Sequence, residues 1–208
     1  TLAQLGTPDV VFLSHPSHAN RLLRLSPAFC AMRKAGLVRQ YSGSEPIPLS
    51  DDVVAHPIRV PHDGGATFGF RIERERGLFG PGFSVAYAAD LGTWSADAAR
   101  AMVNVDVLAL EFNHDVGLQR ASRRPPHLIA RVLGNQGHLS NEQAGSLLGE
   151  ILQASRPGRL QGLVQLHLSR QCNRVELARA AASKTMKSNR VTSAIYTADQ
   201  YKPIRVSI

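Results

Sequence analysis

Apolar and polar residues in this chain are arranged so that short strands end abruptly in side chains capable of chemistry. Within residues 85–115 two apolar runs of strand length end at Asp90 and at Glu111. Residues 95–103 lie between them with apolar positions at helical spacing, which predicts a strand, a helix and a second strand. Open α/β sheets bind their ligands beyond the carboxyl ends of such strands. This stretch is therefore the first candidate for a functional site.

Three further runs of strand length end at a histidine. They are residues 10–13 before His15, residues 58–61 before His62, and residues 163–166 before His167. Imidazole nitrogens and carboxylate oxygens suit zinc, manganese or iron, and a rigid sheet fixes their geometry. Together with Asp90, these histidines predict a metal centre assembled from distant parts of the chain. The alternative for each histidine taken alone is a structural role, in which its side chain only makes hydrogen bonds at the end of a strand.

Periodicity divides the rest of the chain into short elements. Residues 21–34 have apolar positions at helical spacing, but Pro27 predicts a break. Ser140 and the three residues after it match a capping box, which predicts a helix start. The other expected elements are strands over 9–13, 53–60, 67–73 and 163–166, helices over 127–133 and 175–182, a basic loop over 119–126, and a terminal hairpin of 191–197 with 204–208. Residues 1–208 are expected to form a single domain.

Charge adds a candidate partner to this picture. The chain carries 24 lysines and arginines against 16 acidic residues, a formal net charge of +8. The basic residues gather within residues 21–39, 120–131 and 184–190. Basic surfaces bind polyanions such as nucleic acid by releasing condensed counterions, so nucleic acid is the expected partner. The alternative is an arginine-rich face that is simply solvated.

Composition excludes other classes of protein. A hydrophobic fraction of 43% with 19% charged residues is ordinary for a globular chain and excludes wholesale disorder. No apolar run approaches the roughly 20 residues that span a bilayer, so no membrane partner is expected. Cys30 and Cys172 lie far apart without a CxxC pattern, which favours reduced thiols in a cytoplasmic protein.

Three motifs in the second half of the chain carry a resemblance to a known family. The sequence is Leu-Glu-Phe-Asn-His-Asp at residues 110–115, Gly-His-Leu-Ser-Asn at 137–141 and His-Leu-Ser at 167–169. In these motifs and their order it resembles the metallo-β-lactamase-fold hydrolases, in particular the YycJ/WalJ-like branch of phosphodiesterase and exonuclease relatives. His62 and Asp90 fall where that family carries a histidine ligand and a metal-bridging aspartate.

The resemblance implies a fold, a cofactor and a set of residues. The fold is α/β (α+β), a metallo-β-lactamase-like αββα sandwich of two packed sheets with outer helices. The cofactor is two divalent metal ions, zinc or manganese, which supply a hydroxide for phosphodiester cleavage. His114 and His138 would lie near the phosphate as donors or general acids; their alternative role is to cap a strand or helix. The residues it assigns to the metals are His15, His18, His62, Asp90 and His167.

Two departures from the family pattern bear on this assignment. The family's Thr-His-x-His-x-Asp-His motif corresponds to Ser-His-Pro-Ser-His-Ala-Asn at residues 14–20. Only His15 is in register there, and His18 serves as a ligand only if the loop rearranges. The strands that precede this motif in the family have no counterpart here, which would leave a sheet edge exposed.

Three hypotheses follow from this reasoning. The leading one is a metal-dependent hydrolase, a phosphodiesterase or exonuclease that acts on DNA. The second is a catalytically impaired relative that binds nucleic acid or a protein partner through the retained fold. The third keeps the hydrolase but assigns it a small phosphodiester or a thioester. An exposed sheet edge also makes a homo-oligomer an expectation.

Overall fold

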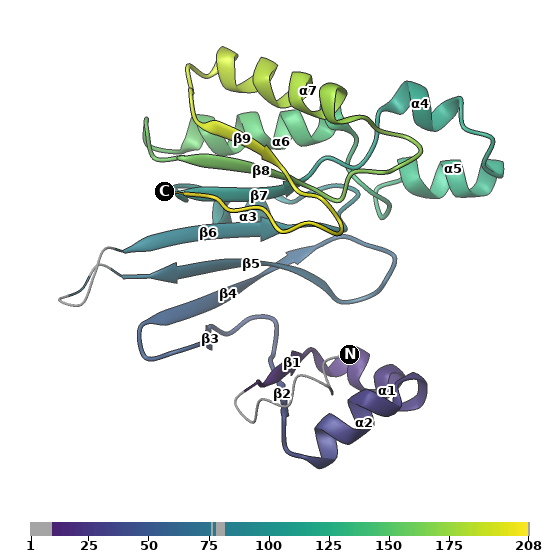
Figure 1. Cartoon of the computed structure of the whole chain (residues 1–208), viewed down its shortest axis with the longest axis vertical. Coiled ribbons are helices and arrows are strands. Elements are labelled where there is room, and N and C mark those ends of the chain that lie inside the picture. The colour runs from purple at the N-terminus through teal and green to yellow at the C-terminus, as the bar shows by residue number, and fades with distance from the viewer. Residues whose placement is uncertain (1–9, 76, 78–81, 208) are drawn as a thin grey trace.

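The computed structural model describes residues 10–75, 77 and 82–207, whose strands form two sheets. In the smaller sheet β1 (Phe12–Ser14) lies parallel to β2 (Val38–Gln40). The larger sheet has seven strands in chain order (Figure 1). These strands are β3 (Ile47–Pro48), β4 (Val53–Val60), β5 (Thr67–Arg74), β6 (Phe83–Ala88), β7 (Val107–Glu111), β8 (Gly162–Leu166) and β9 (Ala194–Thr197).

Strand directions in the larger sheet bring several strand ends to one edge. β3, β4, β5 and β6 pair antiparallel in succession, whereas β6, β7, β8 and β9 pair in parallel. β4 therefore runs in the same direction as β6 to β9. The carboxyl ends of these five strands lie along the same edge, where segments remote in sequence meet.

Helices connect the parallel strands and cover one face of the sheet (Figure 1). The helices in the described residues are α1 (Pro16–Leu25), α2 (Pro27–Lys34), α3 (Ala96–Ala101), α4 (Val116–Arg120), α5 (Pro126–Leu133), α6 (Asn141–Ala154) and α7 (Val175–Ser188). Of these, α3, α6 and α7 contribute buried side chains to the main core. That core forms because alternate residues of a strand point to the same face, where apolar helix faces cover them.

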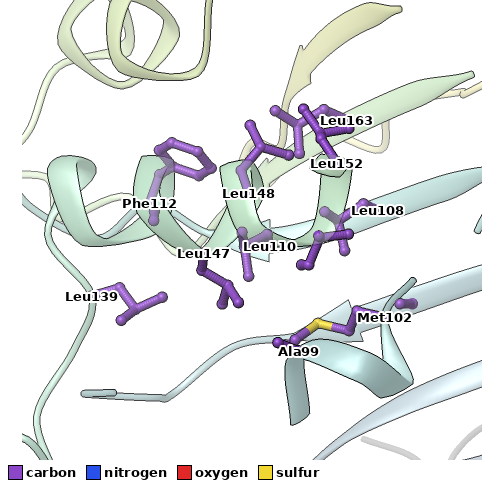
Figure 2. Close-up of a cluster of buried hydrophobic side chains, with 14 of the residues drawn as sticks. Ala99, Met102, Leu108, Leu110, Phe112, Leu139, Leu147, Leu148, Leu152 and Leu163 are labelled. Atoms are coloured by element: carbon purple, nitrogen blue, oxygen red, sulfur yellow. The ribbon is translucent and has the colours of Figure 1, made fainter. Parts of the chain in front are cut away.

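The main core lies between the strands and these three helices. Leu108 and Leu110 of β7 are fully buried and face Leu147 and Leu148 of α6 (Figure 2). Met102, at the end of α3, closes the same cluster from below in this view. The opposite sheet face holds a smaller cluster of Val107, Ala109 and Val164, against which the C-terminal segment packs. The helix-covered face of the sheet therefore buries more apolar surface than the opposite face, and it contributes more to stability.

The N-terminal part contributes two helices and the two-stranded sheet, which lie outside the larger sheet. The break at Pro27 is confirmed, because α1 ends at Leu25 and Ser26 caps α2 by accepting a hydrogen bond from the Phe29 amide at 3.2 Å. Phe12 of β1 packs edge-on against Phe29, with ring centroids 5.6 Å apart. β1 pairs with β2 and is not part of the larger sheet, so the expected strand over 9–13 is shifted and half exposed. Residue 9 lies outside the described residues.

Several other expected elements are confirmed. β4 has the predicted bounds, β5 and β8 differ by one residue, and α5 covers the predicted short helix. The capping box at Ser140 is present and begins α6. α7 continues six residues beyond the predicted end. The helix α3 begins after Ser95, whose hydroxyl accepts from the Ala98 amide.

Two expectations about elements are wrong. The terminal hairpin does not form, because β9 pairs in parallel with β8 and residues 204–207 make no strand; residue 208 lies outside the described residues. The expected loop over 119–126 begins inside a helix, since Asp115 caps α4 and α4 extends to Arg120. In both cases the local sequence pattern did not specify the contacts that the segment makes in the folded chain.

Two further points concern the class of protein. Within the described ranges no helix combines the length and the apolar character needed to cross a bilayer. Cys30 and Cys172 are both free thiols in the structure.

A core substitution tests this architecture. Leu148→Ala removes a fully buried side chain between α6 and the sheet. We expect it to lower the free energy of unfolding by about 2–5 kcal/mol, measured by denaturant titration. Leu177→Ala on α7, where the side chain is 38% exposed, is the control and should cost less than about 1 kcal/mol. Equal losses in the two variants would contradict the packing described here.

Candidate metal centre

The shared strand edge gathers polar side chains from β6, β7 and β8. Asp90 follows β6, Glu111 is the last residue of β7, and His167 follows β8. His138 reaches the same place from the loop between α5 and α6. This loop is held by backbone hydrogen bonds from His138 N to Val132 O at 3.1 Å and from Asn113 N to Leu139 O at 3.1 Å. The side chains come together because the strands end at the same edge and because backbone hydrogen bonds hold the His138 loop beside it.

These residues form one compact group. Asp90, Glu111, His138 and His167 each offer one ligand atom, and these atoms all lie within 4.8 Å of one another. His138 Nδ1 lies 2.9 Å from Glu111 Oε1, and His167 Nδ1 lies 3.3 Å from the same oxygen. Asp90 Oδ1 lies 3.4 Å from His167 Nδ1 and 3.7 Å from His138 Nδ1. Two imidazoles therefore face two carboxylates.

Glu111 is the buried member of this group. Its side chain is 0% exposed, and its second oxygen, Oε2, accepts a hydrogen bond from the Leu91 amide at 3.0 Å. Burial alone would raise the pKa of Glu111, but hydrogen bonds from His138 and His167 outweigh it and hold the pKa below its ordinary value. The same contact with Glu111 raises the pKa of His167. Glu111 is thus an ionised carboxylate inside the protein.

The donor set fits a divalent cation. Two imidazole nitrogens and two carboxylate oxygens are typical ligands of zinc and are also accepted by manganese. Within the described part of the chain neither Asp90 nor Glu111 pairs with a lysine or arginine, so only histidines balance their charge. Asn113 Nδ2 donates to the His167 carbonyl at 2.8 Å and fixes that loop. These residues would hold one ion.

Backbone conformation supports a functional role for two of the four residues. Asp90 and His167 both have φ near 57° in the left-handed region. Non-glycine residues adopt this region rarely, although Asp and His are among those that tolerate it, and such positions gather at functional sites. Here the unusual φ occurs two residues after the end of β6 and directly after β8, at the two residues that bring these strand ends into the group.

The group lies in an open cleft of about 630 Å³. The cleft is lined by Asp90, His138 and His167, by apolar residues that include Tyr87, and by Arg124 and Arg131 from the α4–α5 region. Burial, followed by the charges of Asp90 and Glu111, raises the pKa of Tyr87, so its phenol is neutral at physiological pH. The cleft therefore combines polar, apolar and cationic walls, which suits an organic anion.

His62 lies beside the group without joining it. Its ring centroid is 5.1 Å from that of His138, and its Nδ1 contacts the Gly137 carbonyl at 3.0 Å. The neighbouring Asp63 forms an ion pair with Arg131, and this guanidinium holds the pKa of Asp63 below its usual range. The expected ligand role of His62 stays a prediction.

The N-terminal histidines occupy a different place. His18 Nε2 contacts the Ala66 carbonyl at 2.9 Å, and His15 Nδ1 contacts the Ser17 hydroxyl at 2.8 Å. The ring of His15 packs against Phe68 of β5, with centroids 5.1 Å apart. The structure does not bring either histidine into the group of four. Both are held by contacts with the start of β5.

His114 is fully buried, and neither of its ring nitrogens has a hydrogen-bond partner among the described residues. Burial lowers its pKa, so the ring is neutral. A buried ring cannot reach a substrate in the cleft, so the geometry does not favour the expected role of His114 at a phosphate. His138, by contrast, lines the cleft and lies within the group.

Sequence reasoning missed Glu111 as a member of the site. A signal was available, since Glu111 is an acidic residue at the end of a wholly apolar run. A charge in such a strand is rarely buried without partners, so its position indicates a polar site. Tyr87 and Arg124 gave no such signal, since an aromatic in a strand and an arginine in a basic loop are common.

The chain is similar to known proteins over part of its length, although no protein-family model matches it. A 103-residue stretch is 27% identical to the exodeoxyribonuclease YycJ of Bacillus anthracis, covering 50% of this chain and 38% of that protein. The chain thus spans well under half the length of this curated relative.

Several solved structures resemble this chain in fold. Zn²⁺-bound PqqB from Methylobacterium extorquens has a TM-score of 0.60 at 15% identity, over 95% of this chain and 65% of that chain. An isothiocyanate hydrolase from Delia radicum gut bacteria gives 0.54 at 11% identity, over 99% and 70%. A diphosphatase from the PhnP family gives 0.52 at 13% identity, over 89% and 54%. The chain has the metallo-β-lactamase fold. The expected α/β fold class is confirmed. Of the two packed sheets that were expected, the described residues form one seven-stranded sheet, which carries the cleft, and a separate two-stranded pair.

The buried neutral ring of His114 predicts a pH dependence of stability. An unfolded histidine titrates near pH 6.5. Because the pKa of folded His114 is lower, its neutral form stabilises the fold above that pH, and the contribution is lost as pH falls through about 6.5. We expect the free energy of unfolding to drop further between about pH 8 and pH 5 in the unmodified protein than in His114→Asn.

Denaturant titration at the two pH values measures this difference. His127→Asn on α5, where the side chain is exposed, is the matched control and should retain the drop of the unmodified protein. A drop in His114→Asn as large as in the control would contradict the burial described here.

Proposed function

We propose that this chain is a metal-dependent hydrolase of the phosphodiesterase type that acts on DNA. The observation that carries the proposal is the group of Asp90, Glu111, His138 and His167 in an open cleft. The basic net charge and the arginines at the cleft support a polyanionic substrate. Similarity to an exodeoxyribonuclease over half of the chain supports DNA within that class.

The residues of the group have distinct roles in this proposal. Asp90, Glu111, His138 and His167 would hold a zinc or manganese ion, which supplies a Lewis acid and a water activated for attack. Asp90 and His167 are about half exposed, so a substrate in the cleft could reach an ion that they hold. The expectation of two ions, with His15, His18 and His62 as further ligands, stays a prediction.

His138 has a second role open to it when substrate is bound. Its Nδ1 is occupied by Glu111 at 2.9 Å, and no partner of its Nε2 is present among the described residues. If Nδ1 binds the ion beside Glu111, the proton of the neutral ring lies on Nε2. In this arrangement the Nε2–H would donate a hydrogen bond to a substrate oxygen and position it, and the expected role of His138 at the phosphate stays a prediction.

A second candidate function is binding of nucleic acid without cleavage. The placement of His15 and His18 favours it, because both are held at the start of β5 and lie outside the group of four. Without these histidines only one ion would be held, and one ion cannot clamp the attacking and the leaving oxygen together as two ions do. The same assay separates the two functions, since binding without metal-dependent cleavage supports the second.

The cleavage assay uses labelled single- and double-stranded DNA with zinc or manganese. We expect cleavage that chelation abolishes, and we expect Asp90→Asn and His138→Asn each to reduce the rate by at least about 100-fold. Asp97→Asn and His127→Asn are matched controls at exposed positions on α3 and α5 and should retain the rate. No cleavage while metal is bound, or equal rates in Asp90→Asn and Asp97→Asn, would sink the proposal.

A further inference from the structure

One wall of the cleft carries an aromatic ring without a partner. Tyr87 of β6 lines the cleft and is 43% exposed. Among the described residues its ring makes no aromatic contact and its hydroxyl makes no hydrogen bond. Large aromatic side chains usually bury their area or pair with another ring. An open ring beside a group of metal-ligating residues therefore calls for an external partner.

The surroundings of Tyr87 leave room for that partner. Its neighbours in register are Phe70 on β5, whose ring contacts Tyr41, and Ala109 on β7. Ala89 lines the cleft two residues further along the chain. Alanine side chains extend by a single carbon, so on the β7 side they do not fill the space beside the ring. Leu166 and Leu168 add apolar surface to the same cleft. A flat apolar group can lie there in contact with the ring face.

Arg124 supplies a cation to the same cleft. Its Nε and Nη2 contact the Gln171 amide oxygen at 3.1 and 2.9 Å, which is a neutral partner. Within the described residues Arg124 pairs with no carboxylate, whereas Arg131 is neutralised by Asp63. The side chain of Asp199, also in the cleft, accepts from the amides of Tyr201 and Lys202. Arg124 therefore has an uncompensated charge in the cleft.

The combination defines a ligand chemistry. The ligand would carry a flat ring that stacks on Tyr87 and an anion that pairs with the Arg124 guanidinium. Both would be joined to the phosphodiester that lies at Asp90, Glu111, His138 and His167. A nucleotide unit has this combination of parts. We propose that Tyr87 and Arg124 form a nucleotide-recognition subsite, in which Tyr87 stacks on a nucleobase and Arg124 binds the phosphate next to the scissile bond. This inference rests on the proposed function, because it names the part of the substrate that the same cleft holds.

The subsite predicts a preference for phosphodiesters that carry a nucleobase. A phosphodiester without a base would keep the contact with Arg124 and lose the contact with Tyr87. Stacking is tolerant of sequence, because every base presents a π-face. The subsite therefore selects nucleic acid over small aliphatic phosphodiesters without selecting a sequence.

Equilibrium binding in the absence of metal tests the subsite independently of turnover. The probes are a short fluorescein-labelled single-stranded oligonucleotide and an abasic oligonucleotide of the same length, followed by fluorescence anisotropy. We expect Tyr87→Ile, which keeps a good strand former, to weaken binding of the base-containing probe by about ten-fold. The same variant should leave the abasic probe unchanged, and Tyr87→Phe, which keeps the ring, should behave like the unmodified protein.

Arginine variants test the second half of the subsite. Arg124→Gln should weaken both probes and lower the salt dependence of binding by about one counterion. Arg123→Gln is the matched control, since Arg123 is exposed and does not line the cleft. Circular dichroism of each variant verifies that the fold is kept. The difference in affinity between Tyr87→Phe and Tyr87→Ile measures the contribution of the aromatic ring.

The outcomes separate this inference from the proposed function. Equal effects of Tyr87→Ile on the two probes, no effect on either, or an Arg123→Gln loss as large as that of Arg124→Gln overturns the subsite. Failure of the unmodified protein to bind either probe overturns it as well. Base-dependent binding together with absent metal-dependent cleavage leaves the subsite standing and contradicts only the proposed hydrolysis.

Discussion

The carboxylate of Glu111 is the interaction on which the site depends. It is fully buried at the end of β7, and its two oxygens are divided between the Leu91 amide and the two histidines of the group. A buried carboxylate is stable only when its hydrogen bonds are made, so the positions of His138, His167 and the segment after β6 are constrained together. Loss of any partner would leave a charge without compensation inside the protein.

The sheet makes this interaction geometrically available. Parallel pairing of β6, β7 and β8 puts three strand ends side by side, and the core on the helix face holds these strands rigidly. The left-handed φ of Asp90 and His167 then turns two side chains toward the edge. The cleft that results is lined by the charged group, by the Tyr87 ring and by Arg124, which pairs with no carboxylate among the described residues. Chemistry and recognition thus depend on the same strand ends.

Much of this could be predicted from the sequence where the signal is local. The strand, helix and strand around Ser95 and the break at Pro27 follow from periodicity and from the steric properties of proline. The placement of Asp90 and His167 at strand ends followed in the same way. Pairing partners could not be predicted, because a strand pattern does not specify its neighbour or direction; the terminal hairpin was therefore wrong and β9 pairs with β8.

The candidate site was only partly within reach of the sequence. His138 lies in a loop, and the Val132 carbonyl and Leu139 backbone that position it are contacts of the folded chain. The burial of Glu111 and of His114 depends on which side of a strand end faces the core, a property that spacing alone leaves open. His15 and His18 followed from a family motif that the chain only partly carries, and the structure keeps them at β5.

The most direct test of the central claim, that these four residues hold a metal ion, is the metal content of the protein by elemental analysis against protein concentration. The protein should be measured as purified and again after incubation with zinc or manganese and removal of excess ion. The account predicts at least about one ion per chain, as expected for a four-ligand site, and loss of that ion in Asp90→Asn. No ion retained under either condition, or full retention in Asp90→Asn, would contradict it.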